Sequence, residues 1–149
     1  MDDLINSCDR ALRALFGIKK CSRPNPSSGA SESELSEQER THVAGLMRIN
    51  HTGEICAQAL YEGQALLART PEAKASLLEA AEEESDHLSW CRSRLDELNA
   101  APSLLNPLFY SASFAIGALA GAVGDRISLG FVEATEDEVV HHIRKHLKV

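Results

Sequence analysis

The stretch LMRINHTGEICAQALYEGQ, residues 46–64, decides the fold of this chain. It contains no proline, and the apolar residues Ala57 and Tyr61 follow Glu54 by three and seven positions. Residues at these spacings share one face of an α-helix, so the pattern places a carboxylate inside an apolar stripe. Burying an unpaired carboxylate costs free energy. Glu54 is therefore predicted to hold a proton, a cationic partner or a metal ion.

A second stretch, EEESDHL at residues 82–88, carries Glu84 and His87 at positions i and i+3. This spacing puts both side chains on one helix face, where they can reach the same metal ion. Glu54 lies 17 residues before Pro71 and Glu84 lies 13 residues after it. At about 1.5 Å per residue, both sites are roughly 20–25 Å from the turn. An antiparallel hairpin would bring them together.

Capping signals set the helix boundaries. Ser36 and Glu39 form a capping box, and the helix that follows can run without proline to Arg69. Thr70 is predicted to cap a second long helix that begins at Pro71 and continues to about residue 98.

Residues 98–124 carry no charge. Asn106 and Pro107 are predicted to cap and begin a helix here, and Gly117-x-x-x-Gly121 allows another helix to approach closely. The length permits a membrane span, but the polar and glycine residues favour a buried or membrane-grazing helix. A last helix is predicted from Asp125 to about Lys148.

The N-terminal part has apolar residues at helical spacing over residues 3–17, with basic neighbours that include Lys19 and Lys20. Such a helix can dock on the bundle or lie on an anionic membrane surface, and both readings stay open. Residues 22–35, rich in serine and proline, are predicted to be a flexible linker. The expected organisation is all-α and a single domain, 1–149, with an amphipathic helix at 1–21 and bundle helices at 36–149.

Composition excludes some functions. The net charge of −7 argues against a general nucleic-acid binder, which needs a basic surface. Four cysteines occur without a C-x-x-C pair, so a zinc ribbon is not indicated, and free thiols in a reducing compartment are expected. The N-terminus shows no secretory signal pattern.

Two further E-x-x-H pairs occur. Glu39 of the pair Glu39/His42 already serves the capping box, and spacing alone favours Glu138/His141 in the last helix, although a solvated charged face is the simpler reading there. A di-iron carboxylate site takes a Glu from each of two helices and an E-x-x-H pair from each of two others. Carboxylates with one imidazole per metal suit iron or manganese.

These motifs together resemble the demethoxyubiquinone hydroxylase family of ubiquinone biosynthesis. The resemblance rests on four segments and covers nearly the whole chain. They are LMRINHTGE at 46–54 with AQALYEGQ at 57–64, EEESDHL at 82–88, the apolar region 104–124, and FVEATEDEVVHH at 131–142.

The resemblance implies a ferritin-like four-helix bundle that holds two iron ions. It assigns metal ligation to Glu54, Glu84, His87 and Glu136, so Glu136 replaces Glu138 as the expected ligand of the last helix. His142 is implied to lie near the site and to orient a ligand carboxylate. Family members carry a further helix with a second E-x-x-H pair. This sequence stops at Val149, so we expect a truncated form, or a site completed by another chain, with an incomplete second iron site.

The implied activity is an oxygen-dependent ring hydroxylation of a polyprenylated methoxy-benzoquinol. Implied partners are the quinol, dioxygen, a membrane surface, and a homo-oligomer or a ubiquinone-biosynthesis complex. The expected location is the cytoplasmic face of the cell membrane, as a peripheral protein. Two alternatives share part of the pattern: a ferritin-like iron-storage protein, and a non-catalytic, membrane-associated helical scaffold.

Overall fold

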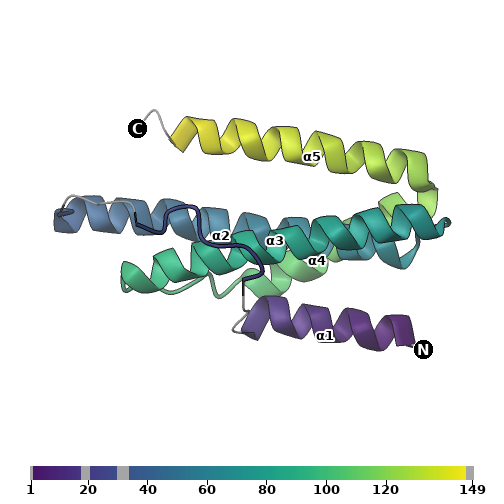
Figure 1. Cartoon of the computed structure of the whole chain (residues 1–149), viewed down its shortest axis with the longest axis horizontal. Coiled ribbons are helices and arrows are strands. Elements are labelled where there is room, and N and C mark those ends of the chain that lie inside the picture. Colours follow the sequence, from purple (N-terminus) through teal and green to yellow (C-terminus); the bar gives the residue numbers. More distant parts are fainter. Residues whose placement is uncertain (1, 18–20, 30–33, 147–149) are drawn as a thin grey trace.

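The computed structural model describes residues 2–17, 21–29 and 34–146. Within these ranges the chain is all-helical and has no strand, which confirms the predicted class. The helices, labelled in Figure 1, are α1 (Asp2–Phe16), α2 (Glu37–Leu66), α3 (Pro71–Glu97), α4 (Asn106–Val123) and α5 (Asp125–His146). Lys19, Lys20 and the predicted helix end at Lys148 lie outside the described residues.

The central element is α2, which packs against both α3 and α4. Figure 1 shows α1 along one side of this group and α5 along the opposite side. The buried core consists mainly of aliphatic side chains with two tyrosines, Tyr61 and Tyr110. Ile55 and Ala59 of α2 pack there against Leu88 of α3 and Tyr110 of α4. In α5 only Ser128 is buried among the side chains that are described. The last helix, α5, is therefore attached to the rest of the bundle mainly near its N-terminal end.

The predicted caps of the two long helices are confirmed. The Ser36 backbone N–H donates to the Glu39 carboxylate at 2.9 Å, and the Glu39 backbone N–H donates to Ser36 Oγ at 3.3 Å. Thr70 Oγ1 accepts from the backbone N–H of Ala73 at 3.3 Å, with proline at the first helical position. These side chains satisfy backbone donors that a helix N-terminus leaves without a partner.

The α2 helix ends at Leu66, three residues before the predicted end at Arg69. The reason is a tie to α5. The backbone N–H groups of Arg69 and Thr70 donate to the Asp125 carboxylate, each at 2.9 Å. These donors are used by the first residue of α5, so the chain leaves the helix before Arg69.

The predicted cap at Asn106 is wrong. Asn106 is the first residue of α4, and this helix has no side-chain cap. The Asn106 side chain turns toward α2 instead: its Oδ1 accepts from Thr52 Oγ1 at 2.9 Å, and its Nδ2 lies 3.4 Å from His51 Nδ1. The amide therefore joins two helices, and it is not available to cap its own helix.

Glycines bring α4 and α2 into backbone contact, as the Gly-x-x-x-Gly pattern predicted. A Cβ atom added to Gly117 would overlap the carbonyl oxygen of Leu60, and one at Gly121 would lie 2.7 Å from the carbonyl oxygen of Gln64. On the other helix, a Cβ at Gly63 would overlap the carbonyl oxygen of Phe114. The two helices can approach this closely only because these three positions lack side chains.

The other face of α4 is exposed. Leu108 and Leu119 are 65% and 70% exposed, and Leu104, just before the helix, is 95% exposed. By length and composition alone α4 could cross a membrane, yet such a test is also passed by helices of other kinds. The helix is thus buried only on the face that carries Asn106, Tyr110, Gly117 and Gly121. The buried helix that the sequence indicated is found in part.

Replacing Gly117 with alanine is expected to lower the free energy of unfolding by about 1–3 kcal/mol, because the new methyl group meets backbone that cannot rotate away. Chemical denaturation followed by circular dichroism measures the change. Gly130→Ala is the control: nothing lies within 4 Å of its added Cβ, and alanine is the better helix former. Equal stability of the two variants would contradict the close approach.

Candidate metal centre

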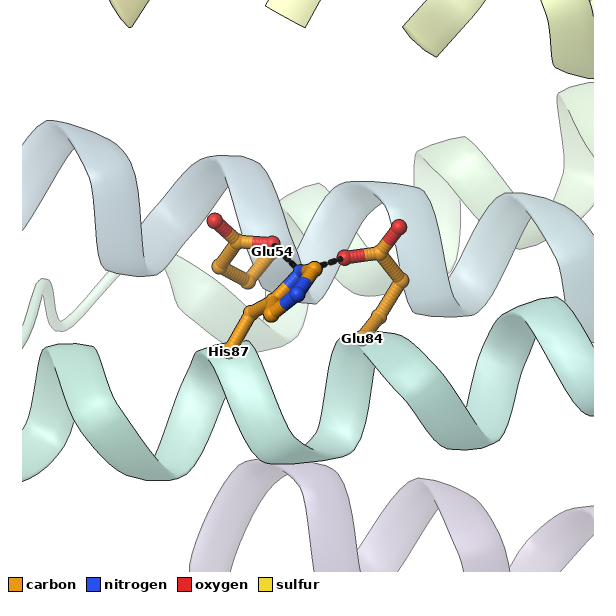
Figure 2. A group of neighbouring side chains, drawn as sticks. All are labelled: Glu54, Glu84 and His87. Carbon is orange, nitrogen blue, oxygen red and sulfur yellow. Dashed lines mark hydrogen bonds and ion pairs between the residues drawn. The ribbon is translucent and has the colours of Figure 1, made fainter. Parts of the chain in front are cut away.

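The α2–α3 hairpin brings together three of the predicted ligands. Figure 2 shows Glu54 of α2 with Glu84 and His87 of α3. His87 Nδ1 lies 2.9 Å from Glu84 Oε2 and 3.7 Å from Glu54 Oε2. One ligand atom from each residue lies within 4.8 Å of the others. The prediction that Glu54 lies as far from the Pro71 turn as Glu84 and His87, and so meets them in the hairpin, is therefore confirmed. A single ion could contact all three side chains.

The charges of this cluster are interdependent. Burial raises the pKa of Glu54 to about 7, and the neighbouring Glu84 carboxylate adds to the rise while His87 opposes it. The carboxylates of Glu54 and Glu84 raise the pKa of His87 to about 10. Burial works against ionisation of Glu84, but the contacts with His87 and Glu54 and the charge of Arg23 together outweigh it, so the pKa of Glu84 is lowered. A protonated imidazole thus supplies the positive charge that the carboxylates need.

A divalent metal fits this position by its chemistry. Two carboxylates and one imidazole are the donor set that iron and manganese accept in proteins. The same three groups would exchange the shared protons for the ion, since a metal binds the deprotonated forms. The geometry within 4.8 Å and the excess of negative charge both favour a cation.

The cluster lies on a cavity of about 1190 Å³. Glu54, Glu84 and His87 contribute to its wall from α2 and α3, and Glu136 contributes from α5. Glu136 is exposed and does not belong to the close group of three. The structure therefore places the fourth predicted ligand on the same cavity without bringing it into contact with the others.

His142 lines a second, smaller cavity of about 410 Å³, together with Glu54. Glu138 and His141, the pair favoured by spacing, line the same cavity and are not among the close group. Neither the ligand role of Glu136 nor the orienting role of His142 is tested by these positions, and both remain predictions.

Glu62 is a buried carboxylate that the sequence analysis did not single out. Its side chain is fully buried; Tyr110 donates its hydroxyl to Glu62 at 2.7 Å, and Gln58 Nε2 donates at 3.0 Å. Arg10 of α1 lies 3.6 Å from the same carboxylate. Gln58 is a neighbour on the same helix, but Arg10 and Tyr110 come from α1 and α4, and no local sequence pattern indicates those two contacts. The contact also shows that α1 docks on the bundle, one of its two predicted roles.

All four cysteines, each in the described part of the chain, are free thiols as expected. Cys91 is buried and lines the large cavity near the cluster. Burial and the nearby carboxylates Glu54 and Glu84 raise the pKa of its thiol to about 12. Cys91 therefore lines the cavity as a neutral thiol, and it is not one of the three residues of the close group.

Comparison with known proteins places these features in a family. The model of the family described as "Ubiquinone biosynthesis protein COQ7" matches residues 37–149, which include all four predicted ligands. The chain belongs to the COQ7 family. This match begins at the first residue of α2.

Individual relatives are similar to the chain over α1 as well, because their alignments cover 99% of its residues. A protein of Ralstonia pickettii named 3-demethoxyubiquinol 3-hydroxylase is 57% identical over 158 residues, which cover 99% of this chain and 73% of the relative. A protein of the same name from Azotobacter vinelandii is 58% identical over 148 residues, covering 99% of this chain and 69% of the relative. No solved structure matches the chain.

The affinity of the cluster for ferrous iron is expected to rise with pH. Glu54 and His87 must each release a proton to bind the ion, so affinity should rise by up to about a hundredfold per pH unit below the Glu54 pKa of about 7. Between pH 7 and the His87 pKa of about 10, only His87 releases a proton and the rise falls to about tenfold per unit.

Anaerobic titration against a ferrous chelator at several pH values measures this slope. In Glu54→Gln the steep part below pH 7 should disappear while the His87 slope remains. An affinity that does not change between about pH 6 and pH 8 would show that these protons are not linked to metal binding.

Proposed function

We propose that the chain is a di-iron monooxygenase that hydroxylates the ring of a polyprenylated methoxy-benzoquinol in ubiquinone biosynthesis. The observation that carries this proposal is the group Glu54, Glu84 and His87, whose ligand atoms lie within 4.8 Å on the wall of a large cavity. The activity for which the relatives are named, 3-demethoxyubiquinol 3-hydroxylase, supports the reaction and the substrate class.

In this proposal Glu54, Glu84 and His87 hold iron, and Glu136 approaches from α5 across the cavity. Bound iron supplies the dioxygen chemistry that amino-acid side chains cannot. The chain itself supplies the enclosure. Val139, Val140 and Ile143 of α5 face the ligand helices across the cavity, and this apolar wall would hold an aromatic ring and limit the entry of water.

Tyr61 lines the same cavity as the cluster and contributes a neutral hydroxyl. It is 1% exposed and lines the cavity. Burial, followed by the charges of Glu84, Glu136 and Glu54, raises the pKa of Tyr61 far above its ordinary value. The hydroxyl therefore stays protonated near neutral pH and remains a hydrogen-bond donor.

Glu84→Ala is expected to abolish iron binding, because it removes one ligand and the hydrogen-bond partner of another, His87. Iron per chain is measured by metal analysis after anaerobic loading with ferrous iron. Hydroxylation of a short-chain methoxy-benzoquinol is measured on the same samples. Glu82→Ala is the matched control, an exposed carboxylate on the same helix.

Iron and turnover in the wild type and in Glu82→Ala, both lost in Glu84→Ala, would support the oxygenase. Iron without turnover would favour a storage role. Equal iron content in all three proteins would show that Glu84 does not bind iron, and would favour the non-catalytic helical scaffold.

We also propose that the chain is a peripheral protein of the cytoplasmic face of the cell membrane. The support is the exposed apolar surface of the α4 region, where Leu104, Leu108 and Leu119 are 65–95% exposed. Large exposed apolar side chains that follow one another along a helix mark an interaction surface. A quinol with a prenyl tail resides in the lipid, so contact with the bilayer would bring the cavity to its substrate.

Changing Leu104 and Leu108 together to glutamate is expected to lower binding to lipid vesicles at least about tenfold, because two large apolar side chains no longer leave water. Co-sedimentation with anionic vesicles measures binding. Leu67→Glu, at an exposed leucine just after α2, is the control. Undiminished binding of the double variant would assign the membrane contact elsewhere.

A further inference from the structure

One buried carboxylate on α3, the helix that carries Glu84 and His87, binds the segment that precedes α2. Asp86 is 4% exposed. Its Oδ1 accepts from the Ser22 backbone N–H at 2.8 Å, and its Oδ2 accepts from Ser22 Oγ at 2.6 Å. Oδ2 also accepts from the Arg23 backbone N–H at 3.2 Å and from Arg23 Nε at 3.1 Å. Two consecutive residues thus supply every one of these four donors.

The residues that follow this tie line the large cavity. Asn25, Pro26, Ser27, Ser28 and Gly29 border the same space as the metal cluster. We call residues 22–29 the strap. The sequence predicted a flexible linker here, and the structure shows that its first residues are fixed to α3 by hydrogen bonds.

The strap is also held in shape by its own contacts. The Asn25 side-chain oxygen accepts from the Ser27 backbone N–H at 3.0 Å and from Ser27 Oγ at 2.8 Å. The Ser28 backbone N–H donates to the Asn25 carbonyl at 3.0 Å. These bonds form a local turn that presents polar groups at a fixed position, which lowers the entropy lost when a ligand binds.

Trp90 connects the strap to the cluster. The Arg23 guanidinium lies over its ring, 5.8 Å from the centroid, and the His87 ring lies 5.2 Å from it on the same helix. Trp90 lines the cavity, and its indole N–H is buried without a hydrogen-bond partner in the described part of the chain.

We propose that the strap is a substrate-contacting wall of the metal cavity, and that Asp86 is the positioning residue that holds it there. The proposal rests on the function proposed above for the ligand, a ring that carries oxygen substituents. The α5 wall of the cavity offers apolar side chains, whereas the strap offers Asn25, Ser27 and Ser28. The strap thus adds to the wall a group of polar side chains, outside the metal cluster, that can hydrogen-bond the methoxy and hydroxyl oxygens of the ring.

The test uses Trp90, the single tryptophan of the chain, as its reporter. Asp86→Asn keeps the side-chain shape but loses the charge and one acceptor oxygen. Fluorescence of the full chain is recorded with acrylamide as quencher, and then with a water-soluble methoxy-benzoquinone as the binding probe. Asp96→Asn is the matched control: the same change on the same helix, breaking an exposed ion pair with Arg92. Ser22→Ala and Arg23→Ala weaken the tie from the strap side.

In Asp86→Asn we expect Trp90 to be more accessible to acrylamide, and the quinone to bind about tenfold more weakly. Iron content should equal that of the wild type, which separates positioning of the strap from loss of the cluster. Ser22→Ala and Arg23→Ala should change both readouts in the same direction, and Asp96→Asn should change neither.

Wild-type acrylamide quenching and quinone affinity in Asp86→Asn would overturn the proposal, and the two strap variants decide the same question if Asp86→Asn does not fold. If the wild type binds no quinone at all, the proposed function fails. The acrylamide result then still decides whether Asp86 holds the strap.

Discussion

The fold depends on how four carboxylates are compensated inside two helices. Glu54 and Glu62 of α2 and Glu84 and Asp86 of α3 are all largely withdrawn from water. A buried carboxylate is tolerated only with a proton, a cation or several donors beside it. Each of the four has a different arrangement of partners, and these partners come from α1, the strap, α3 and α4 as well as from α2.

The need to compensate these buried carboxylates explains the docking of two peripheral segments, α1 and the strap. Arg10 brings α1 to Glu62, where Tyr110 of α4 also donates, and the strap supplies four donors to Asp86. Only the pair formed by Glu54 and Glu84 shares a histidine and opens on a cavity. The buried charge is therefore compensated by donors and arginines at Glu62 and Asp86, and by the protonated His87 at the third place, where we propose that a metal ion binds.

The sequence predicted the features that follow from periodicity along one helix. The rise per residue and the Thr70-Pro71 turn were enough to place Glu54 level with Glu84 and His87. In an antiparallel helical hairpin, residues equally far from the turn lie side by side. The close approach at Gly117 was readable for the same reason, since small residues four apart lie on one face. In both cases the decisive information is local.

Features that depend on distant partners were missed or misread. Asn106 carries a capping signal, but its side chain bonds residues of α2 that precede it by more than 50 positions. Asp86 stands inside the very motif used to find the cluster, yet its partners are 63 and 64 residues away. A single sequence gives no sign of which side chains converge across such separations.

The tie at Asp125 has a mechanical consequence for Glu136. Asp125 fixes the first turn of α5 to the α2–α3 turn, and beyond Ser128 no described side chain of α5 is buried. Glu136 lies 11 residues from this pivot, which is roughly 16 Å along the helix axis. A tilt of α5 by about 10° would therefore carry its carboxylate about 3 Å. The distance between Glu136 and the other three side chains therefore depends on the tilt angle of α5.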